Sequence, residues 1–127
     1  MSKTVKICVI DNDDLVREGI ESFIQSLGYE AGTFASAAEY LACNRIYDYS
    51  CIIADVQMSG MTRIEFQEQL ISKGLSTPII FMGTHSTKAL ARRITEAGAI
   101  GFLLKPLKVD SLIELLAKAL KSESDSR

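Results

Sequence analysis

The sequence predicts an α/β protein: a doubly wound, five-stranded parallel sheet with helices on both faces, in three layers, α/β/α. Three observations carry this prediction. Five short apolar runs alternate with segments of helical period, three of these runs are almost continuously apolar, and the chain has 127 residues. Strict β–α alternation is typical of parallel sheets, and continuous apolarity indicates strands that are buried on both faces. The length suits a single domain.

Each of the five apolar runs has the length and the β-branched content of a strand. In chain order they cover residues 5–10, 29–34, 50–54, 78–82 and 100–103, and the second is the weakest. Apolar residues at helical spacing predict amphipathic helices between them, most clearly after the first run and after the last. The two stripes are Val16, Ile20, Phe23, Ile24 and Leu27, and Val109, Leu112, Leu115, Leu116 and Ala119.

Two kinds of signal mark the helix ends. A Ser or Thr followed three residues later by Glu forms a capping box, which starts a helix. The two pairs are Ser36 with Glu39, and Thr62 with Glu65. Glycine after a helical segment favours the left-handed conformation that ends a helix. The glycines at such positions are Gly28, Gly74 and Gly98. We expect one folded domain over residues 1–121 and a flexible polar tail over residues 122–127.

Composition excludes several classes of function. The net charge is −2, so nothing favours direct nucleic-acid binding, which needs a basic patch. No apolar run has the length of a signal peptide or a transmembrane helix, and no basic amphipathic stretch favours a membrane surface. The three cysteines, Cys8, Cys43 and Cys51, lack metal-ligand spacing and fit no disulfide framework. We expect a cytoplasmic protein.

Charged residues follow three of the five expected strands: Asp11 the first, Asp55 the third and Lys105 the fifth. Because ligands of open α/β sheets bind beyond the carboxyl ends of the strands, these side chains are expected at one rim. Taken singly, each has a simpler interpretation, since an aspartate often caps a turn and most lysines are solvated. Together, two carboxylates and one ammonium describe a site for a metal-bound phosphoryl group, with an aspartate as the nucleophile.

The sequence resembles the receiver domain of two-component response regulators, the CheY-like superfamily, over almost its whole length. The likeness is carried by residues 7–17, 52–61 and 78–106, the last of which ends in Ala-Gly-Ala-Ile-Gly-Phe-Leu-Leu-Lys-Pro. The resemblance implies the flavodoxin-like strand order 2-1-3-4-5. It also implies that Asp55 accepts a phosphoryl group, that Lys105 pairs with the phosphoryl oxygens and that Asp11 belongs to an acidic pocket.

For the metal, the resemblance implies Mg²⁺ held by Asp11, Asn12, Asp55 and the backbone carbonyl of Gln57. The sequence departs from the family here, because Asn12 stands where a second acid is usual. An amide oxygen can coordinate Mg²⁺, but one negative charge is lost. A unit-charge pair at ~4 Å is worth about 4 kcal/mol at an effective dielectric constant of ~20, so weakened Mg²⁺ binding is expected. Asp13, one residue further along, is a candidate replacement.

For the conformational switch, the resemblance places Phe102 at the aromatic position and aligns Gly83 with a Ser or Thr at the end of the fourth strand. Glycine has no hydroxyl to hold a phosphoryl oxygen. Thr84 is adjacent, but side-chain direction alternates along a strand, so this hydroxyl is expected to point elsewhere. The sequence therefore predicts a switch without its usual hydroxyl.

Three hypotheses of function follow. The first is a receiver, not an enzyme beyond self-phosphorylation and self-dephosphorylation, in which Asp55 takes a phosphoryl group from a histidine kinase or a phosphotransfer protein. It would signal to an output domain or protein, or by homodimer formation, through the face made by the fourth helix, fifth strand and fifth helix. The second is a phosphorylation-independent pseudo-receiver that binds proteins, motivated by Asn12 and Gly83. The third, a flavodoxin-like cofactor binder or small enzyme, is disfavoured because the acidic turn after the first strand would repel a phosphate.

Overall fold

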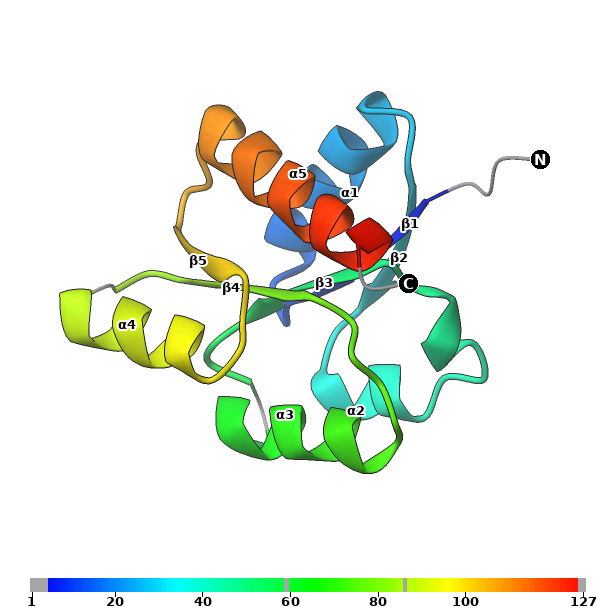
Figure 1. Ribbon diagram of the computed structural model, residues 1–127. Helices are drawn as coiled ribbons and strands as arrows, with labels where there is room; N and C mark the ends of the chain where they lie inside the picture. Colours follow the sequence, from blue (N-terminus) through cyan, green and yellow to red (C-terminus); the bar gives the residue numbers. More distant parts are fainter. Residues whose placement is uncertain (1–4, 59, 86, 126–127) are drawn as a thin grey trace.

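The computed structural model describes residues 5–58, 60–85 and 87–125, and its five strands form one parallel sheet in the order β2-β1-β3-β4-β5 (Figure 1). The predicted fold class and strand order are both confirmed. The strands are β1 (Lys6–Ile10), β2 (Glu30–Phe34), β3 (Cys51–Asp55), β4 (Ile79–Gly83) and β5 (Gly101–Leu104). Each begins one residue later than the sequence indicated, and the last three also end one residue later. Asp55 and Gly83 are therefore the last residues of their strands.

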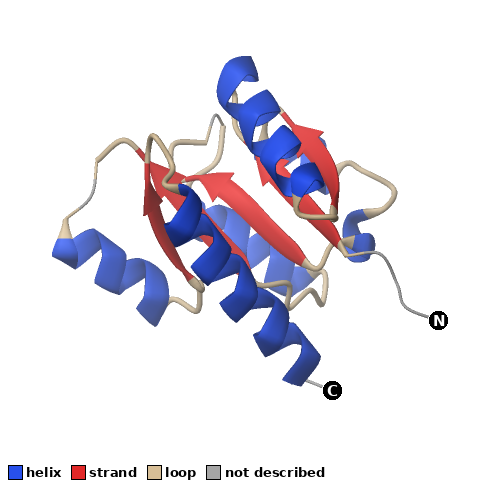
Figure 2. Cartoon of the chain, turned by 90° about the horizontal axis from the view of Figure 1, so that it is seen from above, coloured by secondary structure: helices blue, strands red, loops and turns tan. Residues whose placement is uncertain are grey.

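Helices cover both faces of the sheet. They are α1 (Asp14–Ser26), α2 (Ala37–Leu41), α3 (Arg63–Ser72), α4 (Lys88–Glu96) and α5 (Val109–Asp125), with a short 3₁₀ helix η1 (Ile46–Asp48) after α2. α1 and α5 pack on one face, and α2, α3 and α4 on the other (Figure 1). Figure 2, which looks down on the first face, shows α5 crossing in front of the strands. This is the three-layer arrangement that right-handed β–α–β connections produce.

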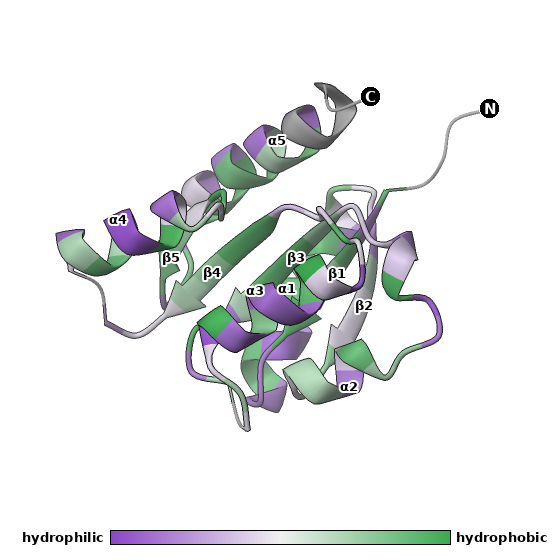
Figure 3. Cartoon of the chain, turned by 60° about the horizontal axis from the view of Figure 1, so that its bottom comes forward, coloured by the Kyte–Doolittle hydropathy of each residue, from purple (hydrophilic) through white to green (hydrophobic). Residues whose placement is uncertain are grey.

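The core consists of two hydrophobic clusters, one on each face of the sheet. Ile7 and Val9 of β1 pack with α1 and α5, whereas Cys8 and Ile10 pack with the helices of the other face. β1, β3 and β4 lie inside the sheet and are almost completely buried, as their continuous apolarity indicated. Figure 3 shows the apolar strands between helices with polar outer sides. The residues at the ends of the central strands are therefore held in place by a well-packed core.

The helix-end signals are largely confirmed. At α3 the capping box is complete, since the Thr62 hydroxyl accepts the N–H of Glu65 and the Glu65 carboxylate accepts the N–H of Thr62. At α2 it is half formed: the Ser36 hydroxyl accepts the N–H of Glu39, but the Glu39 carboxylate accepts the N–H of Ala35 instead. Three glycines end helices with positive φ: Gly28 (92°), Gly74 (75°) and Gly98 (103°).

The C-terminal helix is longer than the sequence suggested. α5 continues to Asp125, so residues 122–125 of the expected tail belong to this helix. Glu is a good helix former and Ser is only mildly unfavourable, so a polar composition does not by itself end a helix. Residues 126–127 of the expected tail lie outside the described residues. Of the helices in the described part of the chain, none is long and apolar enough to cross a membrane.

Candidate functional site

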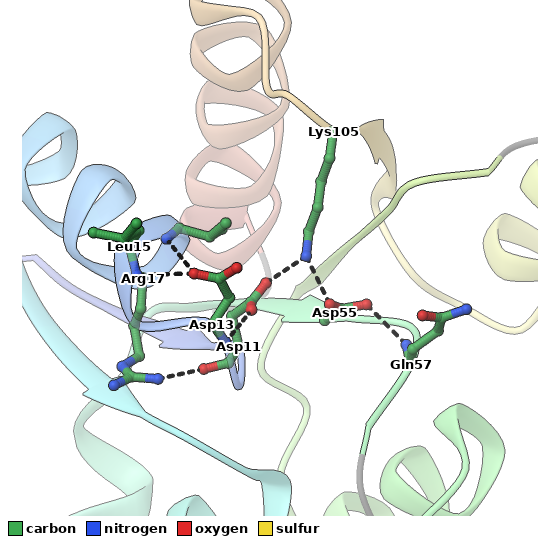
Figure 4. A network of polar contacts seen from close by, with 8 residues as sticks. Asp11, Asp13, Leu15, Arg17, Asp55, Gln57 and Lys105 are labelled. Carbon is green, nitrogen blue, oxygen red and sulfur yellow. Dashed lines mark hydrogen bonds and ion pairs between the residues drawn. The ribbon is translucent and has the colours of Figure 1, made fainter.

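Asp11, Asp55 and Lys105 come together at the carboxyl ends of the strands (Figure 4). β1 and β3 are neighbours with Ile10 beside Ala54, so the residues that follow, Asp11 and Asp55, lie side by side. Lys105 follows β5, and its long side chain reaches back across the end of β4 to β3. Its Nζ lies 2.6 Å from Oδ2 of Asp11 and 2.7 Å from Oδ2 of Asp55. One ammonium group thus bridges the two carboxylates.

This cluster is largely removed from water. The Asp11 side chain is 0% exposed, that of Asp55 12% and that of Lys105 14%. Burial alone would lower the pKa of Lys105, but the hydrogen bonds and charges of the two carboxylates outweigh it, so the pKa of Lys105 is raised above its ordinary value of 10.5. Lys105 is therefore charged at neutral pH, and it serves as the counter-ion of both carboxylates.

The other carboxylate oxygens bond to the backbone. Oδ1 of Asp11 accepts the N–H of Asp13 at 2.8 Å, and Oδ1 of Asp55 accepts the N–H of Gln57 at 2.9 Å. The main chain of Asp11 is fixed as well, because its N–H donates to the carbonyl of Phe34 at 3.1 Å. Among the described residues, no buried side-chain nitrogen or oxygen lacks a hydrogen-bond partner. The rim is a closed polar network that holds both carboxylates in one orientation.

Asp13 does not replace the acid that is missing at position 12. Its Oδ1 accepts the N–H groups of Leu15, at 2.9 Å, and Val16, at 3.2 Å, at the start of α1. This N-cap satisfies two backbone donors that the helix itself cannot pair. Oδ1 of Asp13 is therefore engaged at the start of α1, and this side chain does not supply the charge that is absent at position 12.

A cavity of about 10 Å³ lies beside the two carboxylates, which is room for about one water-sized species. The four residues expected to hold Mg²⁺ all line it. The full lining is Ile10, Asp11, Asn12, Ala35, Ser36, Asp55, Gln57 and Met58. Ala35 and Ser36 were not foreseen, although β2 lies beside β1 and its carboxyl end must reach the same rim.

The residues around this cavity suit Mg²⁺, because they carry carboxylate, amide and main-chain carbonyl oxygens, and Mg²⁺ is commonly held by one or two carboxylates plus waters. Within residues 5–58, 60–85 and 87–125, no three acidic, histidine or cysteine side chains are grouped as a metal site. Asp11 and Asp55 thus supply the only carboxylates of the cavity lining, and both already contact Lys105.

The end of β4 differs from this polar cluster. A Cβ atom added to Gly83 would lie 2.9 Å from Cγ2 of Val56 and 3.3 Å from Cζ of Phe102, closer than packed carbon atoms approach. Val56 and the half-buried Phe102 therefore fill the space in which a side chain at position 83 would begin. Thr84 is exposed. A side chain at position 83 would therefore require Val56 and Phe102 to shift.

Arg17 and Val56 are further residues of this region that the sequence analysis did not single out. Arg17 lies in α1 and its guanidinium turns back to the main-chain carbonyl of Asp11. The sequence could have indicated this contact, because Arg17 is a long cationic side chain about one helical turn after the acidic residues that follow β1. For Val56, which follows Asp55, nothing in the local sequence indicates contact with β4.

Known proteins resemble this chain over most of its length. Residues 7–117 match the family model described as the response regulator receiver domain. The response regulator protein TodT of Pseudomonas putida is 32% identical over 121 residues, covering 95% of this chain and 53% of its own. The transcriptional regulatory protein FixJ of Azorhizobium caulinodans is 32% identical, covering 94% and 57%. The chain thus spans about half the length of these relatives.

Solved structures agree with the sequence matches. The response regulator StyR superimposes with a TM-score of 0.87 at 34% identity, covering 98% of this chain and 63% of its own. The chemotaxis protein CheY4 of Vibrio cholerae superimposes with a TM-score of 0.81 at 28% identity, covering 93% and 100%.

Proposed function

The chain belongs to the response regulator receiver family of two-component systems, and we propose that Asp55 accepts a phosphoryl group from a phosphohistidine donor in a Mg²⁺-dependent step. One observation carries the proposal: Asp55 and Asp11 lie side by side at a buried rim and share the ammonium of Lys105. An aspartate held beside a second carboxylate and a cation has the surroundings that a carboxylate nucleophile needs in phosphoryl transfer.

In the proposed reaction, Oδ2 of Asp55 attacks phosphorus. A new O–P bond forms as the P–N bond of the phosphohistidine breaks, and the electron pair of that bond leaves with the imidazole. The N–H of Gln57 keeps Oδ1 of Asp55 in place, and Lys105 turns from the carboxylates to pair with a phosphoryl oxygen. Mg²⁺, when bound, would neutralise charge on the transferring oxygens.

The proposed holders of Mg²⁺ are Asp11, Asn12, Asp55 and the carbonyl of Gln57, because these four residues line one small cavity. With an amide at Asn12 and Lys105 on both carboxylates, the cavity is less negative than one with three acids. We therefore expect Mg²⁺ to bind weakly, and to compete with Lys105 for the same carboxylate oxygens.

The partners in this proposal are a histidine kinase or a phosphotransfer protein upstream and an output domain or protein downstream. Signalling through the face of α4, β5 and α5, by partner binding or homodimer formation, is part of it, as is a cytoplasmic location. Leu104 of β5 is apolar and 52% exposed on this face, and it lines a groove together with Leu115 of α5, which supports the use of this face as a contact surface.

A phosphorylation-independent pseudo-receiver is the second candidate. Two observations favour it: Asp13 caps α1 and does not supply the negative charge that is absent at Asn12, and Val56 and Phe102 occupy the space beside Gly83. In that case Lys105 would only neutralise the charges of Asp11 and Asp55, and the protein would act by binding other proteins through its surface.

One experiment separates the two candidates. The chain is incubated with acetyl phosphate and millimolar Mg²⁺, and intact mass and amide NMR spectra are compared with those of Asp55→Ala. We expect the added mass of one phosphoryl group in the wild type and none in the variant. If neither acetyl phosphate nor beryllofluoride produces an Asp55-dependent change, phosphorylation is excluded. Asn12→Asp then tests the cause, because it should restore the response if the lost charge is responsible.

A further inference from the structure

Arg17 connects α1 to the acidic rim. It lies in the first turn of the helix, and its Nη1 donates to the main-chain carbonyl oxygen of Asp11 at 2.6 Å (Figure 4). Nη2 pairs with the carboxylate of Asp14. The Arg17 side chain is only 17% exposed, whereas that of Asp14 is 79% exposed. The guanidinium is therefore held against the loop between β1 and α1 and not extended into solvent.

Arg17 occupies an electrostatically unfavourable position in α1. The amino end of a helix carries partial positive charge, so a cation in the first turn is unfavourable unless it gains other contacts. Here the gain is a charge-assisted hydrogen bond to the peptide unit that joins Asp11 to Asn12. Fixing this carbonyl fixes the plane of that peptide, and with it the direction in which the loop leaves β1.

Asp11 is the residue on which these contacts converge. Its carbonyl is held by Arg17, its Oδ1 by the N–H of Asp13 and its Oδ2 by Lys105. Asn12, the other side chain of the cavity lining in this loop, begins at the same peptide unit. Loss of the Arg17 contact would allow the peptide between Asp11 and Asn12 to rotate, and it would leave the partly buried carbonyl of Asp11 without its hydrogen-bond donor.

We propose that Arg17 is a positioning residue, which orients Asp11 and Asn12 through the Asp11 carbonyl and so prepares the cavity for a divalent cation. The effect of this positioning on Mg²⁺ binding rests on the proposed function. With two carboxylates instead of three, the affinity of the cavity for Mg²⁺ depends on how its ligands are oriented.

The charge and the geometry of Arg17 predict opposite effects. If only its positive charge mattered, its removal would make the rim more negative and tighten Mg²⁺ binding. If it orients the ligands, its removal weakens binding, by about tenfold for the loss of an outer-shell partner. The direction of the change in Mg²⁺ affinity therefore distinguishes a positioning role from an electrostatic one.

The test measures Mg²⁺ dissociation constants by amide NMR titration in about 0.15 M salt, where exposed charges are screened. Arg17→Gln removes the charge and the contact, Arg17→Lys keeps the charge without the planar fork, and Asp14→Asn removes only the exposed partner. We expect weaker binding in Arg17→Gln, a smaller loss in Arg17→Lys and almost none in Asp14→Asn. Unchanged or tighter binding in Arg17→Gln overturns the proposal. Unfolding midpoints, measured in parallel, identify variants that fail to fold. If Arg17→Gln does not fold, the Mg²⁺ affinity of Arg17→Lys, compared with that of the wild type, tests the proposal.

A second readout needs no metal. The N–H of Asp13 donates to Oδ1 of Asp11, so its chemical shift and hydrogen exchange report the orientation of that carboxylate. Both should change in Arg17→Gln and stay as in the wild type in Asp14→Asn; no change in Arg17→Gln overturns the proposal. If the wild type binds no Mg²⁺, the metal part of the proposed function fails, and the Asp13 amide still decides the role of Arg17.

Discussion

Two corners of the same sheet edge are built in different ways. The polar corner, formed by Asp11, Asp55 and Lys105, is a closed network in which every carboxylate oxygen has a partner. The apolar corner, formed by Val56, Gly83 and Phe102, is packed so tightly that a Cβ at position 83 would overlap its neighbours. Both corners lie toward the carboxyl ends of the strands, and only the first holds charged side chains.

The difference shows that the two departures from the family pattern have different physical meaning. Asn12 is exposed at its own position, so the change there removes a charge and leaves the packing intact. Gly83 is buried, and its neighbours have taken the space of the missing side chain. A single substitution can therefore restore the first feature, whereas a side chain at position 83 also requires Val56 or Phe102 to move or to be replaced.

The largest effect is expected at the polar corner. Lys105→Met keeps most of the aliphatic stem but leaves two buried carboxylates without their cation, which should lower the free energy of unfolding by about 3 kcal/mol. Urea unfolding measures this loss, with the exposed Lys108→Met as the matched control. Millimolar Mg²⁺ should stabilise Lys105→Met more than the wild type, because the competing ammonium is gone. A loss no greater than that of Lys108→Met would contradict the network.

The apolar corner should respond to added volume. Gly83→Ala places a Cβ 2.9 Å from Val56, and such overpacking should cost about 1–2 kcal/mol. Val56→Ala makes room, so the double variant should be more stable than the sum of the two single changes indicates. The control is Gly19→Ala, which meets nothing within 4 Å in a helix and should be neutral or stabilising. Additive effects of Gly83→Ala and Val56→Ala would mean that the two residues are not in tight contact.

Much of this comparison could be predicted from the sequence, for identifiable reasons. The period of the apolar residues determines the strands and helices, and the parallel topology brings Asp11, Asp55 and Lys105 to one edge. The sequence could not show that Asp13 is committed to capping α1, because the choice between cap and ligand depends on side-chain direction. Nor could it show that Val56 and Phe102 fill the space at Gly83, because these contacts join residues that are distant along the chain.

The pH dependence of stability should separate the corners further, through a smaller effect. The pKa of Lys105 is raised in the folded state, so its contribution is complete below the ordinary value of 10.5 and is lost as the pH rises through the higher folded pKa. The cost of Lys105→Met relative to the wild type should therefore shrink above about pH 10.5, whereas the cost of Gly83→Ala should stay constant, since no titrating group takes part. Urea unfolding of the three proteins between about pH 8 and about pH 12 measures both differences, and the tyrosines, which titrate in all three, cancel in the subtraction. If the cost of Lys105→Met does not depend on pH, the charge of Lys105 is not what stabilises the polar corner, and its aliphatic packing is the better explanation.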